Sequence, residues 1–146
     1  MLHKRQKGGR GEREFYKLLN DRIASIRLLL GKEEIQPPFQ RNQNQTAIGG
    51  SDLTNPFGLS IEVKRQEALH IASWWEQCTE QAAIESGKAI LAYRQNRKPW
   101  RIRMQLFDLV GIKAINKMPH IDFNPIVEID LTGFMDWFDT FYRGTL

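Results

Sequence analysis

The strand-like segment from Ser60 to Arg65 carries residues whose types and spacing could do chemistry. Side chains alternate between the two faces of a strand, so Glu62 and Lys64 share one face. Ile61 and Val63 share the other. A carboxylate beside an ammonium group can hold a metal ion and stabilise developing negative charge. Taken alone, the same pattern is also typical of an exposed strand face with a surface salt bridge, because Glu-x-Lys is common.

A turn before this strand brings a second acid to the same place. The sequence Asn55-Pro56-Phe57-Gly58 predicts a tight turn, because Asn-Pro followed by Gly is turn chemistry between two runs of apolar character. Folding the chain back there forms a hairpin and places Asp52 opposite Ile61 or Glu62. The sequence therefore predicts that two acids and a lysine converge.

This combination matches the requirements of metal-dependent phosphodiester hydrolysis. Mg²⁺ prefers oxygen ligands, which the carboxylates of Asp52 and Glu62 and the main-chain carbonyl of Val63 would supply. The ion would activate a water molecule and neutralise charge on the phosphorane, and Lys64 could orient or deprotonate that water. The predicted cofactor is Mg²⁺, with Mn²⁺ as a substitute.

Positive charge is concentrated in the first two thirds of the chain. Residues 1–106 contain 18 Lys and Arg against 11 Asp and Glu, whereas residues 107–146 contain 3 against 6. A polyanion would bind the basic part, although a solvated basic face has the same composition. The residues expected to contact DNA phosphates are Lys4, Arg5, Lys7, Arg10, Arg13 and Arg41. A second basic stretch contains Arg94, Arg97, Lys98, Arg101 and Arg103.

The order of predicted elements indicates an α/β fold. Apolar residues at three- and four-residue intervals predict helices over 10–30 and 71–86, stopped by Gly31 and Gly87, and a closing helix after a Thr132 cap. Strands are predicted at 51–54, 59–65, 89–93, 100–106 and 126–129, with an irregular edge strand within 35–41 and a loop at 40–45. We expect a mixed central sheet of about five strands flanked by helices.

Composition excludes several classes of protein. With 146 residues and 41% hydrophobic residues, the chain fits one domain with a real core. The single cysteine, Cys78, excludes an internal disulfide framework and is expected to be packed in a helix. His3, His70 and His120 lack metal-ligand spacing. No apolar run approaches the length of a membrane span, so we expect a cytoplasmic protein without a membrane partner.

Three segments together resemble the PD-(D/E)XK nuclease superfamily, and within it the archaeal-type Holliday-junction resolvases and their phage-encoded relatives. Residues 8–19, with the sequence GGRGEREFYKLL, resemble the opening helix of those resolvases. Ser51-Asp52-Leu53 resembles the superfamily's metal-binding aspartate, with Ser where its name has Pro. Ile61-Glu62-Val63-Lys64 resembles its Glu-x-Lys strand. The resemblance covers about residues 8–106 and leaves 107–146 unmatched.

The resemblance implies roles for individual residues. Asp52 and Glu62 would be metal ligands, Lys64 the catalytic lysine, and Glu12 a helix carboxylate that assists the metal site. Gln77 and Gln81, on the helix after the catalytic strand, would lie near the carboxylates or DNA. The implied fold is restriction-endonuclease-like: a single nuclease domain over 1–146, with a catalytic core at 1–106 and a C-terminal strand-helix extension at 107–146.

The function implied is a Mg²⁺-dependent DNA endonuclease that cuts four-way junctions in recombination or phage DNA processing. Two symmetrical nicks require two active sites, so a homodimer is expected. The likeness to phage proteins implies action in the cytoplasm of a bacterial host. Two alternatives stay open: a general phage endo- or exonuclease without junction preference, and a DNA-binding protein on the same fold that does not cut.

Overall fold

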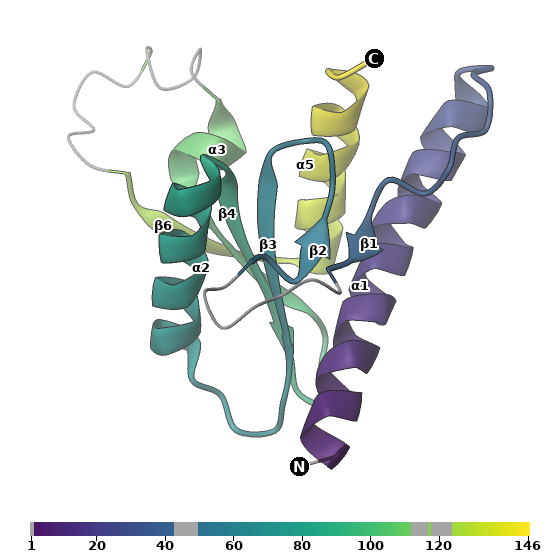
Figure 1. Cartoon of the computed structure of the whole chain (residues 1–146). Helices are drawn as coiled ribbons and strands as arrows, with labels where there is room; N and C mark the ends of the chain where they lie inside the picture. Colours follow the sequence, from purple (N-terminus) through teal and green to yellow (C-terminus); the bar gives the residue numbers. More distant parts are fainter. Residues whose placement is uncertain (1, 43–49, 112–116, 118–123) are drawn as a thin grey trace.

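Six strands form one open sheet with helices on both faces (Figure 1). The computed structural model describes residues 2–42, 50–111, 117 and 124–146. The strands are β1 (Gln40–Arg41), β2 (Leu53–Thr54), β3 (Leu59–Arg65), β4 (Lys88–Arg94), β5 (Arg101–Gln105) and β6 (Ile126–Asp130). The helices are α1 (Leu2–Leu29), α2 (Ile71–Glu85), α3 (Leu106–Val110) and α5 (Leu131–Arg143). The predicted mixed α/β, restriction-endonuclease-like fold is confirmed, with six strands rather than about five.

The strands lie in the sheet in the order of the sequence, from β1 to β6. Among the described strands, β3 and β4 form the one parallel pair, and the other neighbouring pairs are antiparallel. A parallel pair needs a long crossover, which α2 provides. The strand that carries Glu62 and Lys64 is therefore held between neighbours in the middle of the sheet.

Alternation along β4 separates two hydrophobic cores. Ile90 and Ala92 face the larger core, which α1 and α5 cover. Ala89, Leu91 and Tyr93 face the smaller core under α2. Since successive strand residues point to opposite faces, the molecule has three layers: α1 with α5, the sheet, and α2. Cys78 lies in the core under α2, as predicted, where burial raises the pKa of its thiol to about 12.

Helix α1 is longer than its apolar pattern predicts, because it begins at Leu2 instead of near Arg10. Phe15, Leu19, Ile23 and Ile26 are buried on one face, which confirms the predicted amphipathic register. The helix ends before Gly31, whose positive φ of 67° is the left-handed conformation expected of a helix stop. Among the described residues, no helix combines the length and apolar character needed to cross a bilayer.

The predicted hairpin is confirmed and its turn is closed by one side chain. Asn55 Oδ1 accepts hydrogen bonds from the backbone N–H groups of Phe57 (3.0 Å) and Leu59 (3.4 Å). Asn55 Nδ2 donates to the Leu59 carbonyl at 2.8 Å. The turn sets a register in which Leu53 pairs with Ile61. One step further along the antiparallel pair, Asp52 comes opposite Glu62.

The structure corrects the prediction at the outer edge of the sheet. An irregular strand was expected within 35–41, and β1 contains only Gln40 and Arg41. The loop expected at 40–45 was wrong for these two residues, and residues 43–45 lie outside the described part. Two prolines precede β1, and proline lacks the N–H that extends a strand ladder.

The stop of α2 also differs from the prediction. The left-handed residue is Ser86, with φ of 54°, and Gly87 follows it. Gly87 is needed for a different reason: a Cβ at this position would lie 2.4 Å from Ser60 Oγ. The glycine therefore lets the start of β4 approach β3 closely.

The C-terminal helix completes the larger core. Its cap is Asp130, whose Oδ1 accepts from Gly133 N at 2.7 Å, so the predicted Thr132 cap was wrong. Asp130 is preferred because α5 starts directly after β6, one residue before Thr132. The aromatic residues of α5 lie in the larger core or pack against it. Phe134, Phe138 and Tyr142 are buried, and the Phe138 ring lies 5.7 Å from that of Phe39.

Replacing Phe138 by Ala is expected to lower the free energy of unfolding by about 3–5 kcal/mol, because a fully buried ring leaves a cavity. Urea denaturation measures the change. The exposed Thr140 on the same helix is the control, and Thr140→Ala is expected to change stability by about 0.5 kcal/mol or less. Equal effects from the two substitutions would contradict the assignment of α5 to the core.

Candidate active site

Asp52 lies directly before β2 and is hydrogen-bonded to β3. Its N–H donates to the Ile61 carbonyl at 3.0 Å, and its Oδ2 accepts from Val63 N at 2.8 Å. Its own carbonyl accepts from Asn42 N at 2.8 Å. The residue is 8% exposed. Both the backbone and the side chain of Asp52 are therefore bound to backbone groups on β3, in the position that the predicted hairpin requires.

Glu62 meets Asp52 on β3. The two side chains are hydrogen-bonded, and the pKa of Glu62 is raised to about 9. Burial is the main cause, the Asp52 charge and the hydrogen bond add to it, and the Lys64 charge opposes it. Without a cation, Glu62 therefore holds a proton at neutral pH. The predicted convergence of Asp52, Glu62 and Lys64 is present in the structure.

Glu12 adds a third carboxylate from α1. It is 8% exposed, and burial followed by the Asp52 charge raises its pKa above the usual value. Arg41 on β1 opposes that rise, because its Nε donates to Glu12 Oε2 in an ion pair. Arg41 was predicted to contact DNA, and here it neutralises Glu12. Its guanidinium lies 3.3 Å from the position of a Cβ on Gly9, so this glycine makes room for the pair.

The backbone of Val63 faces the same acids. Its N–H donates to Asp52, and the N–H and C=O of one strand residue point to the same side. Its carbonyl therefore also lies on the side of Asp52, away from β4. Two carboxylates and a carbonyl form a donor set suited to a hard divalent cation.

No group of three His, Cys, Asp or Glu side chains in the described part of the chain is arranged as a ready-made metal cage. The donors nevertheless fit a hard cation that keeps several waters, since such an ion needs only one or two carboxylates. The proton held by Glu62 supports this fit. Acids gathered in this way keep a proton because their negative charges would repel each other, and a bound divalent cation can take the place of that proton.

A family model described as phage putative PDDEXK endonuclease matches residues 3–141. The chain belongs to this family. Neither the comparison with curated proteins nor that with solved structures gives a match. The family match extends into the segment 107–146, which the resemblance to archaeal resolvases left out. PDDEXK nucleases are in general dependent on divalent metal ions, in agreement with the donor set of Asp52, Glu62 and Val63.

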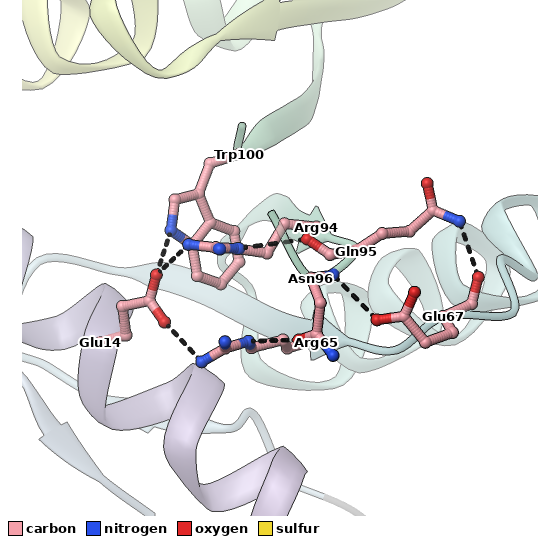
Figure 2. Close-up of polar contacts among 7 residues, drawn as sticks. All are labelled: Glu14, Arg65, Glu67, Arg94, Gln95, Asn96 and Trp100. Atoms are coloured by element: carbon pink, nitrogen blue, oxygen red, sulfur yellow. Dashed lines mark hydrogen bonds and ion pairs between the residues drawn. The ribbon is translucent and has the colours of Figure 1, made fainter. Parts of the chain in front are cut away.

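Within this PDDEXK chain, a second polar network ties α1 to the sheet (Figure 2). The Glu14 carboxylate accepts from Arg65 Nη1 at 3.0 Å, from Arg94 Nη1, and from Trp100 Nε1 at 3.1 Å. Arg65, adjacent to Lys64, is therefore an ion-pair partner of the helix. Glu14 lies two residues after Glu12 on the same helix, so the network fixes the Glu12 carboxylate relative to β3.

The second basic stretch is largely neutralised. Arg94 pairs with Glu14, and both Arg101 and Arg103 pair with Glu128, each at 3.4 Å. Candidate phosphate contacts that remain exposed there are Arg97 and Lys98. On α1, Arg10 and Arg13 are exposed on either side of Glu12, whereas the side chains of Lys4, Arg5 and Lys7 lie outside the described part of the structure.

The two glutamines of α2 have different surroundings. Gln81 Oε1 accepts from Gly50 N at 3.0 Å, which places it against the backbone that leads to Asp52. Gln77 is exposed one turn earlier, and its predicted accessory role stays a prediction. Sequence reasoning missed Glu85, the next residue in this four-residue spacing, which contacts Ser51. Only the spacing of Gln77, Gln81 and Glu85 could have pointed to it.

The histidines are not part of the site as far as the structure describes them. His70 is exposed at the start of α2, where its ring lies 6.0 Å from that of Trp74. His70 is therefore a surface histidine. His120 and the side chain of His3 lie outside the described residues.

Replacing Glu62 by Gln is expected to raise the melting temperature in EDTA at neutral pH, because the carboxyl must take up a proton on folding beside Asp52, whereas the amide is neutral in both the folded and the unfolded state. The same substitution should abolish stabilisation by Mg²⁺. In the wild type, Mg²⁺ at about ten times its Kd should add about 1.4 kcal/mol, or about 3–6 °C. Thermal unfolding with and without Mg²⁺ measures both effects.

The exposed Glu80 on α2 provides the matched control for this charge change, and Glu80→Gln should respond to Mg²⁺ like the wild type. An unchanged Mg²⁺ response in Glu62→Gln would remove Glu62 from the metal site.

Replacing Glu14 by Gln is expected to lower the free energy of unfolding by about 2 kcal/mol, because two arginines and the Trp100 N–H lose an ionised acceptor. The isosteric substitution leaves the packing intact and isolates the charge. Glu34→Gln, at an exposed position, is the control and should have little effect. Urea denaturation compares them, and matching values would mean that the Glu14 network does not stabilise the fold.

Proposed function

We propose that this protein is a Mg²⁺-dependent endodeoxyribonuclease that cuts four-way DNA junctions, with Mn²⁺ able to replace Mg²⁺. The observation that carries the proposal is the convergence of Asp52, Glu62 and Lys64 beside the buried Glu12. Each of these side chains comes from a motif that resembles the resolvases. An interaction protein would have no use for acids whose mutual repulsion destabilises the fold.

The proposed ligands are the carboxylates of Asp52 and Glu62 with the Val63 carbonyl. A bound Mg²⁺ would supply Lewis-acid stabilisation and an activated water. Lys64 shares a strand face with Glu62, and its charge acts on both Glu62 and Glu12. From there its ammonium can orient the attacking water and stabilise charge on the phosphorane. Cleavage would leave 5′-phosphate ends, as the resemblance implies.

DNA contacts are proposed on the face where α1 begins. Arg10 and Arg13 are exposed on that helix and flank Glu12, so phosphates bound there would lie beside the site. Lys4, Arg5 and Lys7 extend the basic stretch toward the N-terminus. Arginine and lysine contacts to phosphate position DNA without reading its sequence. Recognition of backbone shape follows, which suits a branched substrate.

A four-way junction is resolved by two symmetrical nicks, so the proposed active form is a homodimer with two sites on one DNA. The whole chain, 1–146, is proposed to act as one nuclease domain, with the segment 107–146 as an extension of the catalytic core. The match to a phage family supports action in the cytoplasm of an infected bacterium.

The deciding measurement is cleavage of labelled four-way junction, linear duplex and single-stranded DNA in Mg²⁺, Mn²⁺ or EDTA. Wild type should nick the junction symmetrically in Mg²⁺ and not in EDTA. Lys64→Ala should reduce cleavage by about 10²-fold or more while junction binding is retained, because Lys64 acts on the reaction and not on affinity. Lys17→Ala, on the exposed face of α1, is the control.

Cleavage of all three DNAs would replace the resolvase proposal with a general nuclease. Junction binding without cleavage in any metal would leave a DNA-binding protein on a nuclease fold, and would overturn the enzymatic proposal.

A further inference from the structure

The C-terminal turn of α2 is joined to the β2–β3 hairpin through one carboxylate. Glu85 Oε1 accepts from Ser51 N at 3.0 Å and from Gln81 Nε2 at 2.8 Å. Glu85 Oε2 accepts from Ser51 Oγ at 2.5 Å and from Ser60 Oγ at 2.6 Å. These donors hold the pKa of Glu85 below its usual value against the opposing effect of burial. A single side chain thus links both arms of the hairpin.

The residues that Glu85 holds are close neighbours of the proposed metal ligands. Ser51 immediately precedes Asp52. Ser60 is two residues before Glu62 and therefore lies on the same face of β3. A change in the distance between Ser51 and Ser60 would be transmitted to the distance between the two ligands.

A second contact from the same helix supports this link. Gln81 binds Glu85 through its Nε2 and the backbone N–H of Gly50 through its Oε1. The backbone is therefore anchored at both Gly50 and Ser51, on the approach to Asp52. Gly87 also allows the close approach of the chain to Ser60, because any side chain at that position would clash with Ser60 Oγ.

The exposed fractions of Ser51, Ser60 and Glu85 distinguish the hydrogen-bonding role of Glu85 from ordinary core packing. The serines are buried, at 4% exposure for Ser51 and 2% for Ser60, so their hydroxyls need an internal acceptor. Glu85 itself is exposed and packs in neither hydrophobic core. Its contribution to the fold is therefore the set of accepted hydrogen bonds, and substituting it removes no apolar contact from the core.

We propose that Glu85 is a positioning residue for the metal site: through Ser51 and Ser60 it sets the separation of Asp52 and Glu62. This inference rests on the proposed function. It assigns to Glu85 an effect on metal affinity and on the cleavage step, with none on DNA binding. Groups that orient metal ligands commonly change affinity or activity by about 10- to 100-fold when removed.

The test compares Glu85→Ala, Glu85→Gln and the control Glu80→Ala in the full-length protein. One assay is thermal unfolding across a Mg²⁺ titration, which needs no activity. The other is junction cleavage across DNA concentrations, which separates kcat from KM. Glu85→Ala is expected to raise the Mg²⁺ midpoint about tenfold and to lower kcat by about 10- to 100-fold, with KM for DNA unchanged.

Rescue by the conservative variant distinguishes positioning from charge. The new amide oxygen in Glu85→Gln can still accept from Ser51 N and Gln81, and its NH₂ group can donate to a serine oxygen. Glu85→Gln should therefore recover Mg²⁺ binding and kcat to within about fivefold of wild type. Glu80→Ala should match the wild type in both assays.

Several outcomes would overturn the proposal. One is a Mg²⁺ midpoint and kcat for Glu85→Ala within about twofold of Glu80→Ala, and another is a change confined to KM. If Glu85→Ala does not fold, Ser60→Ala is measured in the same assays, and a wild-type Mg²⁺ midpoint and kcat for that variant would equally overturn it. If the wild type binds Mg²⁺ but cuts no DNA, the proposed function fails while the Mg²⁺ titration still decides the role of Glu85.

Discussion

Mutual repulsion among buried carboxylates is the constraint on which the rest of this structure depends. Asp52, Glu62 and Glu12 come from a hairpin arm, a central strand and a helix. Asp52 and Glu12 are buried, and Glu62 is half-buried. Left alone, such acids would move apart or take up protons, and Glu62 does hold a proton. The fold must therefore supply rigid supports and counter-charges, and the polar contacts around the site can be understood in these terms.

The counter-charges come from two neighbouring cations. Lys64 stands next to Glu62 on the strand, and Arg41 pairs with Glu12 from the edge of the sheet. Arg41 is the more informative of the two, because it comes from a strand of only two residues. That short edge strand would contribute little to the sheet by itself. Its position brings the Arg41 guanidinium to the Glu12 carboxylate on α1.

The elements around the site are held in place by residues that have no proposed catalytic role. Glu14 binds α1 to the ends of β3 and β4, and Glu85 binds α2 to the hairpin. The aromatic residues of α5 pack under α1, since the Phe15 and Phe134 rings lie 5.8 Å apart. The position of Glu12 thus depends on residues more than a hundred positions later in the chain, which agrees with a family pattern that extends to residue 141.

The sequence by itself determined what short-range rules govern. The Asn55 turn fixes the register of the hairpin, and strand alternation puts Glu62 and Lys64 on one face, so the central acids and lysine could be placed without a structure. Helical periodicity identified α1, α2 and α5. These features follow from neighbours within a few residues, where backbone geometry leaves few alternatives.

Only the tertiary structure decided which distant groups meet. Nothing local distinguishes Arg41 as the partner of Glu12, or Glu85 as the acceptor for Ser51 and Ser60. The role of Gly87 is another such contact, because a Cβ there would lie 2.4 Å from Ser60 Oγ on the neighbouring strand, while the left-handed residue at the end of α2 is Ser86. Such contacts depend on how helices and strands approach one another, and this approach is set by the packing of the whole core and not by any single stretch of residues.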